Sequence, residues 1–268
     1  MQPEINNILS ALKELDQNTG FNVFIPSLQK EIKYKQLTTE QLKNLLKTVV
    51  DSPIYNSQFI TTFNKIIKDN CLTENVNIKN FTIYDKILIL FKMRIESISN
   101  EFKIIFTEDE IKENNLDYSQ KIINLNEHLN SFLQKQYNFP SEIIENDSYS
   151  LICELPTIET ENKLESELHK NIKIEVQNPE ELREIVGETF INELTKFISK
   201  LTVGTNALDL LTLDFKNRIK VVEQLPTYTI NGVLKFIENY RQKVKELTTV
   251  NINGLEKDLP IDATLFNT

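Results

Sequence analysis

The chain has 268 residues, with 39 acidic against 30 basic side chains, two cysteines and only five glycines. A hydrophobic share of 40% can bury a core, and so few cysteines exclude a scaffold held together by disulfides. No apolar run approaches the ~20 residues that a membrane helix needs, and the first residues show no secretory signal. We therefore expect a soluble protein of a reducing compartment that does not bind membranes.

The N-terminal part predicts a β-hairpin followed by helices. Residues 21–35 alternate apolar and polar side chains on either side of a Pro-Ser break, which is typical of two strands and a turn. Thr38 and Gln41 have the spacing of a capping box, in which each side chain binds a free amide at a helix start. Apolar stripes then predict three helices. The second begins at Ser52-Pro53, and the third, apolar over a wide face, runs from about residue 82 to 97.

Alternation replaces helical periodicity between about residues 100 and 177. It is clear at 102–106, 149–155 and 172–176 and weaker at Ile122-Ile123, and it predicts a small central β-sheet. The stretch 107–147 is harder to assign, but four apolar residues in it have the spacing of a helix: Leu125, Leu129, Phe132 and Leu133.

Helical periodicity returns after residue 177. Asn178-Pro179, followed by two glutamates, is a strong helix start, and the apolar spacing continues to a C-cap at Gly204. Two more helices are predicted at about 215–224 and 230–247. Asn253-Gly254 indicates a turn, and the residues behind it are unusually apolar for a chain end.

These elements predict an α+β fold that is predominantly helical. It has an N-terminal β-hairpin with helices, a small central β-sheet and a C-terminal helical part. By element type, the chain divides into residues 1–98 (hairpin plus helices), 99–178 (β-rich), 179–250 (helical) and 251–268 (apolar tail).

Charge is distributed unevenly along the chain. Residues 141–193 hold 14 acids and 4 bases, a net charge of −10, whereas residues 194–250 hold 9 bases and 5 acids, a net charge of +4. Such a field can steer a basic partner, although solvated helix faces are the commoner explanation of such a charge distribution. The basic surface is too weak to indicate nucleic-acid binding.

The sequence carries no catalytic or metal-binding pattern. The five glycines are isolated, so no phosphate-binding loop is present, and the histidines lie in no metal-ligand spacing. Four side chains are therefore interpreted as packing or surface residues: Cys71, Cys153, His128 and His169. A Cys153–His169 pair stays open, because nucleophile activation depends on geometry that spacing does not show. We predict that the protein is not an enzyme and has no catalytic, cofactor-binding or metal-binding residue.

Two stretches resemble the baseplate hub assembly proteins of T-even-like bacteriophages. The first is the predicted hairpin, where an alternating strand leads into Ile25-Pro26-Ser27, a polar turn, and Ile32-x-Tyr34 before a basic residue. The second runs through Ile67 and Cys71 to Asp85, Arg94 and Ser97. The chain departs from the family pattern at Gln36-Leu37 and at 107–109, where many relatives carry Arg-Pro and a pair of cysteines.

The resemblance implies a non-enzymatic chaperone or binding factor for baseplate hub or tape-measure-type proteins. It would act in the host cytoplasm during virion assembly and would need no cofactor. The nearest alternative is a structural subunit retained in the contractile-tail baseplate of the virion. A third alternative is a small hydrolase with an acidic site, such as Glu165/Glu167 or Glu180/Glu181, although such pairs are more typical of solvated helices.

Two apolar segments are candidates for partner binding. One is the hairpin, through Phe21, Phe24 and Tyr34, because an isolated hairpin needs a packing surface and its other face stays available for strand addition. The other is the tail, through Leu265 and Phe266, which either anchors in a partner or folds back over the helical core.

Overall fold

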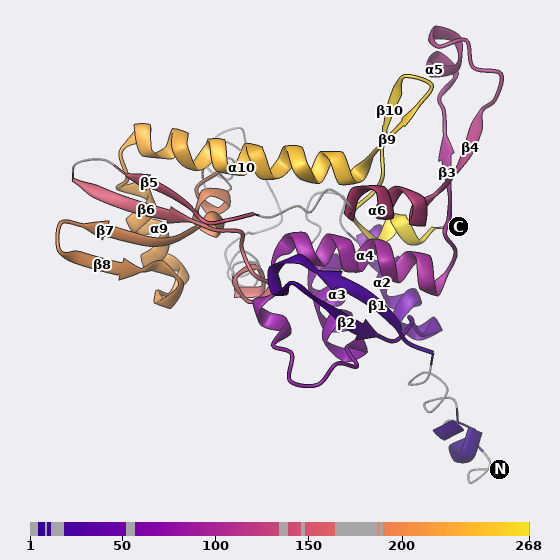
Figure 1. Cartoon of the computed structure of the whole chain (residues 1–268), viewed down its shortest axis with the longest axis horizontal. Coiled ribbons are helices and arrows are strands. Elements are labelled where there is room, and N and C mark those ends of the chain that lie inside the picture. The colour runs from indigo at the N-terminus through magenta and orange to yellow at the C-terminus, as the bar shows by residue number, and fades with distance from the viewer. Residues whose placement is uncertain are drawn as a thin grey trace. The chain divides into compact units, whose positions relative to one another are not determined.

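The structure is a computed structural model that describes residues 5–8, 10–11, 19–51, 57–133, 139–145, 148–163, 187 and 190–267. It has an α+β fold in which helix exceeds strand, as predicted from the sequence (Figure 1). The chain forms two compact units. Unit 1 comprises Met1–Phe81, Asp85–Tyr137 and Lys245–Thr268, and unit 2 comprises Thr82–Tyr84 and Asn138–Val244. Each unit therefore joins segments that are distant in sequence, whereas the four regions expected above divide the chain only by element type.

The N-terminal hairpin of unit 1 confirms the predicted alternation. Strand β1 (Phe21–Ile25) pairs antiparallel with β2 (Lys30–Tyr34), and a 3-10 turn, η1 (Pro26–Leu28), connects them. Alternate side chains of β1 are buried, together with Ile32 and Tyr34 of β2. One face of the hairpin is thus part of the core.

Three helices follow the hairpin. The capping box at the start of α2 (Thr39–Asp51) is formed as predicted: the Gln41 amide donates to Thr38 Oγ1 at 3.2 Å, and the Thr38 amide donates to Gln41 Oε1 at 3.0 Å. Helices α3 (Ser57–Asn70) and α4 (Ile83–Ser97) come next, with η2 (Ile78–Asn80) between them. The wide apolar face of α4 is buried as predicted: Ile87, Leu88, Ile89, Leu90, Phe91 and Met93. The predicted start at Ser52-Pro53 lies outside the described residues.

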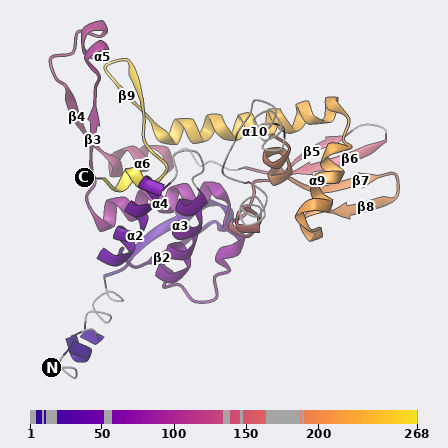
Figure 2. The same ribbon diagram turned by 180° about the vertical axis from the view of Figure 1, so that it is seen from behind.

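Two further hairpins lie side by side in unit 1 (Figures 1 and 2). One consists of β3 (Glu101–Ile105), α5 (Glu108–Glu113) and β4 (Gln120–Asn124), and the other of β9 (Thr249–Ile252) and β10 (Leu255–Asp258). An ion pair of 2.5 Å between Lys257 and Glu110 joins them. After β4, α6 (Leu125–Leu133) confirms the helix that four apolar residues indicated.

The turn between β9 and β10 requires a left-handed backbone. Asn253 has φ 55° and Gly254 has φ 89°, the pair of positive values that a tight hairpin turn needs. Replacing Gly254 by alanine is expected to cost about 1–2 kcal/mol of unfolding free energy, because the new Cβ meets no atom within 4 Å and only the backbone is strained. Gly187→Ala is the matched control: its new Cβ also meets open space, and residue 187 is itself helical with no positive φ, so urea denaturation should show no loss.

Unit 2 contains a four-stranded antiparallel sheet in the order β5-β6-β7-β8. Its strands are β5 (Glu142–Glu145), β6 (Tyr149–Cys153), β7 (Ile198–Val203) and β8 (Asn206–Asp209). After β8 come η3 (Leu210–Thr212), α9 (Phe215–Glu223) and α10 (Thr227–Thr248), the last of which ends in residues counted with unit 1. Both predicted helices near 215 and 230 are confirmed.

Two expectations about strands are corrected. The strands predicted between residues 100 and 177 do not form one sheet, because β3 and β4 pair with each other while β6 joins β7. The helix predicted to reach Gly204 ends at residue 197, and the last six residues before Gly204 form β7. The C-terminal part is consequently not purely helical. The apolar spacing of Leu194, Phe197 and Leu201 fits a helix, but the exposed edge of β6 offers hydrogen bonds that override it. The predicted strand 172–176 and helix start at 178 lie outside the described residues.

Candidate functional site

Four of the five predicted partner-binding residues lie in the core of unit 1. Phe21 and Tyr34 stack with ring centroids 6.2 Å apart, and Tyr34, Leu265 and Phe266 are at most 1% exposed. Phe24 is 38% exposed on the outer face of β1. The structure therefore does not bring the five together into a surface, and Phe24 alone is accessible.

The C-terminal tail folds back over the helical core. Of the two roles considered for it, covering the core and anchoring in a partner, the structure shows the first. Its last turn, η4 (Ala263–Phe266), packs against α2, and the Arg94 guanidinium Nε donates to the Leu265 carbonyl oxygen at 2.9 Å. Asp262 caps the turn by accepting the Thr264 amide at 2.8 Å. The apolar composition of this segment is thus explained by burial.

The residues that carry the family resemblance also have structural roles in unit 1. Asp85 Oδ1 accepts the amide of Ser27 at 3.2 Å, and Ser97 Oγ accepts the amide of Leu37 at 2.9 Å. Cys71 forms a β-bridge with Tyr34. These contacts attach the N-terminal hairpin to the helices.

The cysteines and histidines do not assemble a site in the described part of the chain. Cys153 is fully buried, and burial raises the pKa of its thiol to about 12, so it is protonated at neutral pH. His128 Nε2 lies 2.6 Å from the Leu247 carbonyl oxygen, to which it donates. The described residues include no cluster of three or more potential metal ligands. His169 and the acidic pairs considered above lie outside the described residues.

The two thiols are expected to differ in reactivity. Cys71 is half-buried and Cys153 is inaccessible, and burial raises the pKa of both thiols, that of Cys153 to about 12. Iodoacetamide at pH 8 should therefore modify Cys71 slowly and leave Cys153 unmodified until urea unfolds the protein, as peptide mass mapping would show. Rapid modification of native Cys153 would contradict the buried thiol and reopen its role as a nucleophile.

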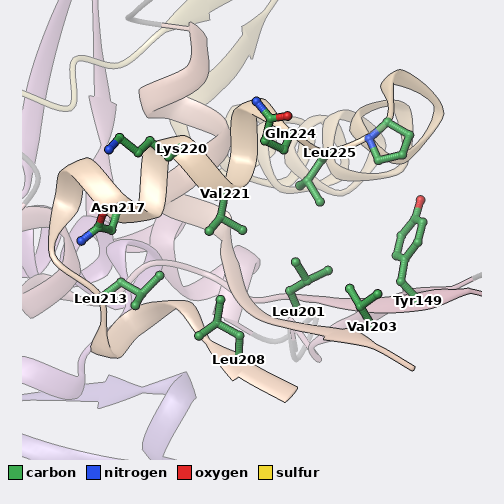
Figure 3. A pocket seen from close by; sticks show the side chains of 11 residues that line it. Tyr149, Leu201, Val203, Leu208, Leu213, Asn217, Lys220, Val221, Gln224 and Leu225 are labelled. Carbon is green, nitrogen blue, oxygen red and sulfur yellow. The ribbon is translucent and has the colours of Figure 1, made fainter. Parts of the chain in front are cut away.

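The candidate site is an apolar groove in unit 2, between one face of the sheet and helix α9 (Figure 3). The groove is open to solvent and has a volume of about 560 Å³. Strands β6, β7 and β8 supply its floor, and α9 with the Leu-Pro segment behind it supplies its roof. The lining side chains are Tyr149, Leu201, Val203, Leu208, Leu213, Asn217, Lys220, Val221, Gln224, Leu225 and Pro226.

Helix α9 is held over the sheet by a buried arginine. Arg218 Nη2 donates to the carbonyl oxygens of Thr195 at 2.5 Å and Ile198 at 2.7 Å, where the chain passes from helix into β7. Burial lowers the pKa of Arg218 to about 10, so the guanidinium stays charged at neutral pH. Asp214 begins the helix by accepting the amide of Asn217 at 2.9 Å. These contacts fix the width of the groove.

Large apolar side chains in and beside the groove are exposed. Val203 is 52% exposed and Leu208 is 36% exposed, and Tyr228, with its ring 6.1 Å from that of Tyr149, is 58% exposed. The Tyr149 hydroxyl is hydrogen-bonded to Thr229 Oγ1, which fixes that ring. An apolar surface of this kind can bind an apolar ligand or protein segment.

No family model, curated protein or solved structure matches this chain. Among the described helices, none combines the length and the apolar character needed to cross a bilayer.

The sequence-based interpretation missed the groove because it assigned residues 194–201 to one helix. A signal was present: Ile198 to Val203 is rich in β-branched residues, and Gly204-Thr205 fits a two-residue hairpin turn as well as a helix C-cap. Gly204 has φ 58°, the positive value that such a turn requires at its first central position.

Proposed function

We propose that this chain is a non-enzymatic binding factor that assists assembly of the baseplate hub of a contractile-tailed bacteriophage. Its partner is a hub or tape-measure-type protein, and it acts in the host cytoplasm. The groove between the sheet of unit 2 and α9 supports binding as the activity, and the resemblance of the hairpin and of the run from Ile67 to Ser97 supports the baseplate as its setting.

The observation that carries this proposal is the open, apolar character of the groove. Val203 and Tyr228 are more than half exposed although the adjacent core buries comparable side chains completely. Exposing such surface to water costs free energy, and covering it contributes ~25 cal/mol per Å² of apolar area. Apolar patches rimmed by polar side chains are typical of protein-binding surfaces, and Asn217, Lys220 and Gln224 supply that rim.

The binding role is tested by co-expression with the neighbouring tail genes. We expect the wild-type chain to co-purify with a hub or tape-measure-type protein and Val203→Glu to reduce that capture at least about tenfold, because it places a charge on the apolar floor of the groove. Ile143→Glu is the matched control, since Ile143 is 60% exposed on β5, at the other end of the same sheet. Equal capture by wild type and both variants would rule out the groove as the binding surface. Absence of any captured tail protein would rule out the proposed function.

A factor that acts only during assembly should be absent from finished particles. Mass spectrometry of purified virions is expected to detect the captured tail protein but not this chain. Its presence at fixed stoichiometry would instead favour the structural-subunit alternative.

A further inference from the structure

We infer that the groove receives an extended segment of the partner protein, which pairs as an additional strand with the free edge of β8 and carries a carboxylate that meets Lys220. This inference rests on the proposed binding function and specifies the conformation and chemistry of what is bound. Three features of unit 2 support it: an unpaired strand edge, an apolar floor beside that edge, and one lysine in the lining.

The edge of β8 has backbone groups available for pairing. β8 is the last strand of the sheet, and all four of its residues are exposed. The amide of Gly204 donates to the Ser148 carbonyl at 3.3 Å. The backbone amides and carbonyls of the even-numbered residues at this end of β7 therefore point toward β6, and those of the odd-numbered residues point toward β8. Val203 and Leu201 are thus in register for backbone hydrogen bonds with Asn206 and Leu208 of β8. Ala207 lies between these two β8 residues, so its backbone amide and carbonyl point away from the sheet.

The two edges of this sheet differ in how they are protected. β5, at the opposite edge, begins with Glu142 and ends with Glu145, and charges of this kind discourage pairing with another chain. β8 has one charged residue, Asp209, which is engaged in accepting the amide of Leu211 at 2.9 Å. The β8 edge therefore accepts a strand more readily than the β5 edge does.

A strand added to β8 would direct alternate side chains toward the groove. Leu208 lies on the groove face of the sheet with Leu201 beside it, so the neighbouring residues of an added strand would extend the same apolar floor. In Figure 3, the side chains of Leu201, Val203 and Leu208 point toward α9 and that of Val221 points toward them. Apolar residues at every second position of the segment fit this arrangement.

Lys220 determines the charge that the segment should carry. It is the charged residue of the lining, and none of the ion pairs among the described residues involves it. Helix α9 itself carries three bases and one acid, so the charge at the roof of the groove is locally basic and complements an acid. An aspartate or glutamate in the bound segment would complement Lys220 at the polar rim.

The inference is tested by selecting displayed random peptides of about 12 residues, long enough to form a strand, on the immobilised full chain. We expect enrichment of sequences that alternate apolar residues and contain an acid at a constant position. Lys220→Glu should weaken binding of the selected peptide at least about tenfold, whereas Lys216→Glu, an exposed lysine of α9 outside the lining, should change it less than about threefold.

Amide exchange then reports the conformation of the bound peptide. With the selected peptide bound, exchange at Ala207 should slow at least about tenfold, because its outward amide gains a hydrogen bond. Enrichment of a helical i, i+3, i+4 pattern, unchanged exchange at Ala207, or no enrichment would overturn the inference. So would a concentration-dependent dimer that Val203→Glu abolishes, since a second copy would then occupy the groove. In these cases, if the wild-type chain still co-purifies with a tail protein and Val203→Glu still reduces that co-purification, the proposed binding function stands and only strand addition is ruled out.

Discussion

Replacing Arg94 by methionine is expected to lower the free energy of unfolding of unit 1 by about 3–5 kcal/mol. The Arg94 side chain is buried, and its guanidinium donates to three carbonyl oxygens, those of Leu265 at 2.9 Å, Glu101 at 3.1 Å and Ser99. Methionine keeps much of the aliphatic volume but leaves all three acceptors without this donor. Since the three carbonyls belong to the tail and to the entry of β3, both segments should loosen together.

The control for this substitution is Arg241→Met. Arg241 is 59% exposed in its side chain and lies 3.9 Å from Glu193, so its loss should cost no more than about 1 kcal/mol. Urea denaturation followed by circular dichroism would compare the two variants, with amide exchange of residues 259–267 as a local measure of tail opening. Similar stability of the two variants would show that Arg94 does not anchor the tail.

Deleting residues 259–268 is expected to unfold unit 1 at physiological temperature. The tail buries Leu259, Leu265 and Phe266 almost completely, and each such side chain contributes ~1.5–3 kcal/mol. Their sum approaches the total stability of a typical domain. The single substitution Phe266→Ala should already cost about 3–5 kcal/mol because it also leaves a cavity.

Ile261→Ala provides the control within the same tail. Ile261 is 44% exposed, so its truncation should change the melting temperature little. If deletion of the tail left melting unchanged but abolished co-purification with the hub or tape-measure-type protein, the tail would be a docking segment despite its buried position. Loss of neither property would contradict both roles.

The sequence by itself determined the elements whose signals are local. The alternation around Pro26, the pair Thr38 and Gln41, and the wide apolar face of residues 83–97 correspond to a hairpin, a capping box and a buried helix. In each case the pattern and the structure it specifies lie within a few residues of each other, so no distant partner had to be known. The Asn253-Gly254 turn belongs to the same class, because its positive φ values require those residue types.

Only the tertiary structure decided the features that depend on distant partners. Ile198 to Val203 becomes a strand because β6 supplies the pairing of Leu151 with Leu201, and the groove exists only once that strand lies beneath α9. The tail illustrates the same limit: its apolar residues suited either a partner or the core, and the choice depends on Arg94, which lies far away in sequence but donates directly to Leu265. Hydrophobicity indicates that a segment must be covered, whereas the identity of what covers it is set by long-range geometry.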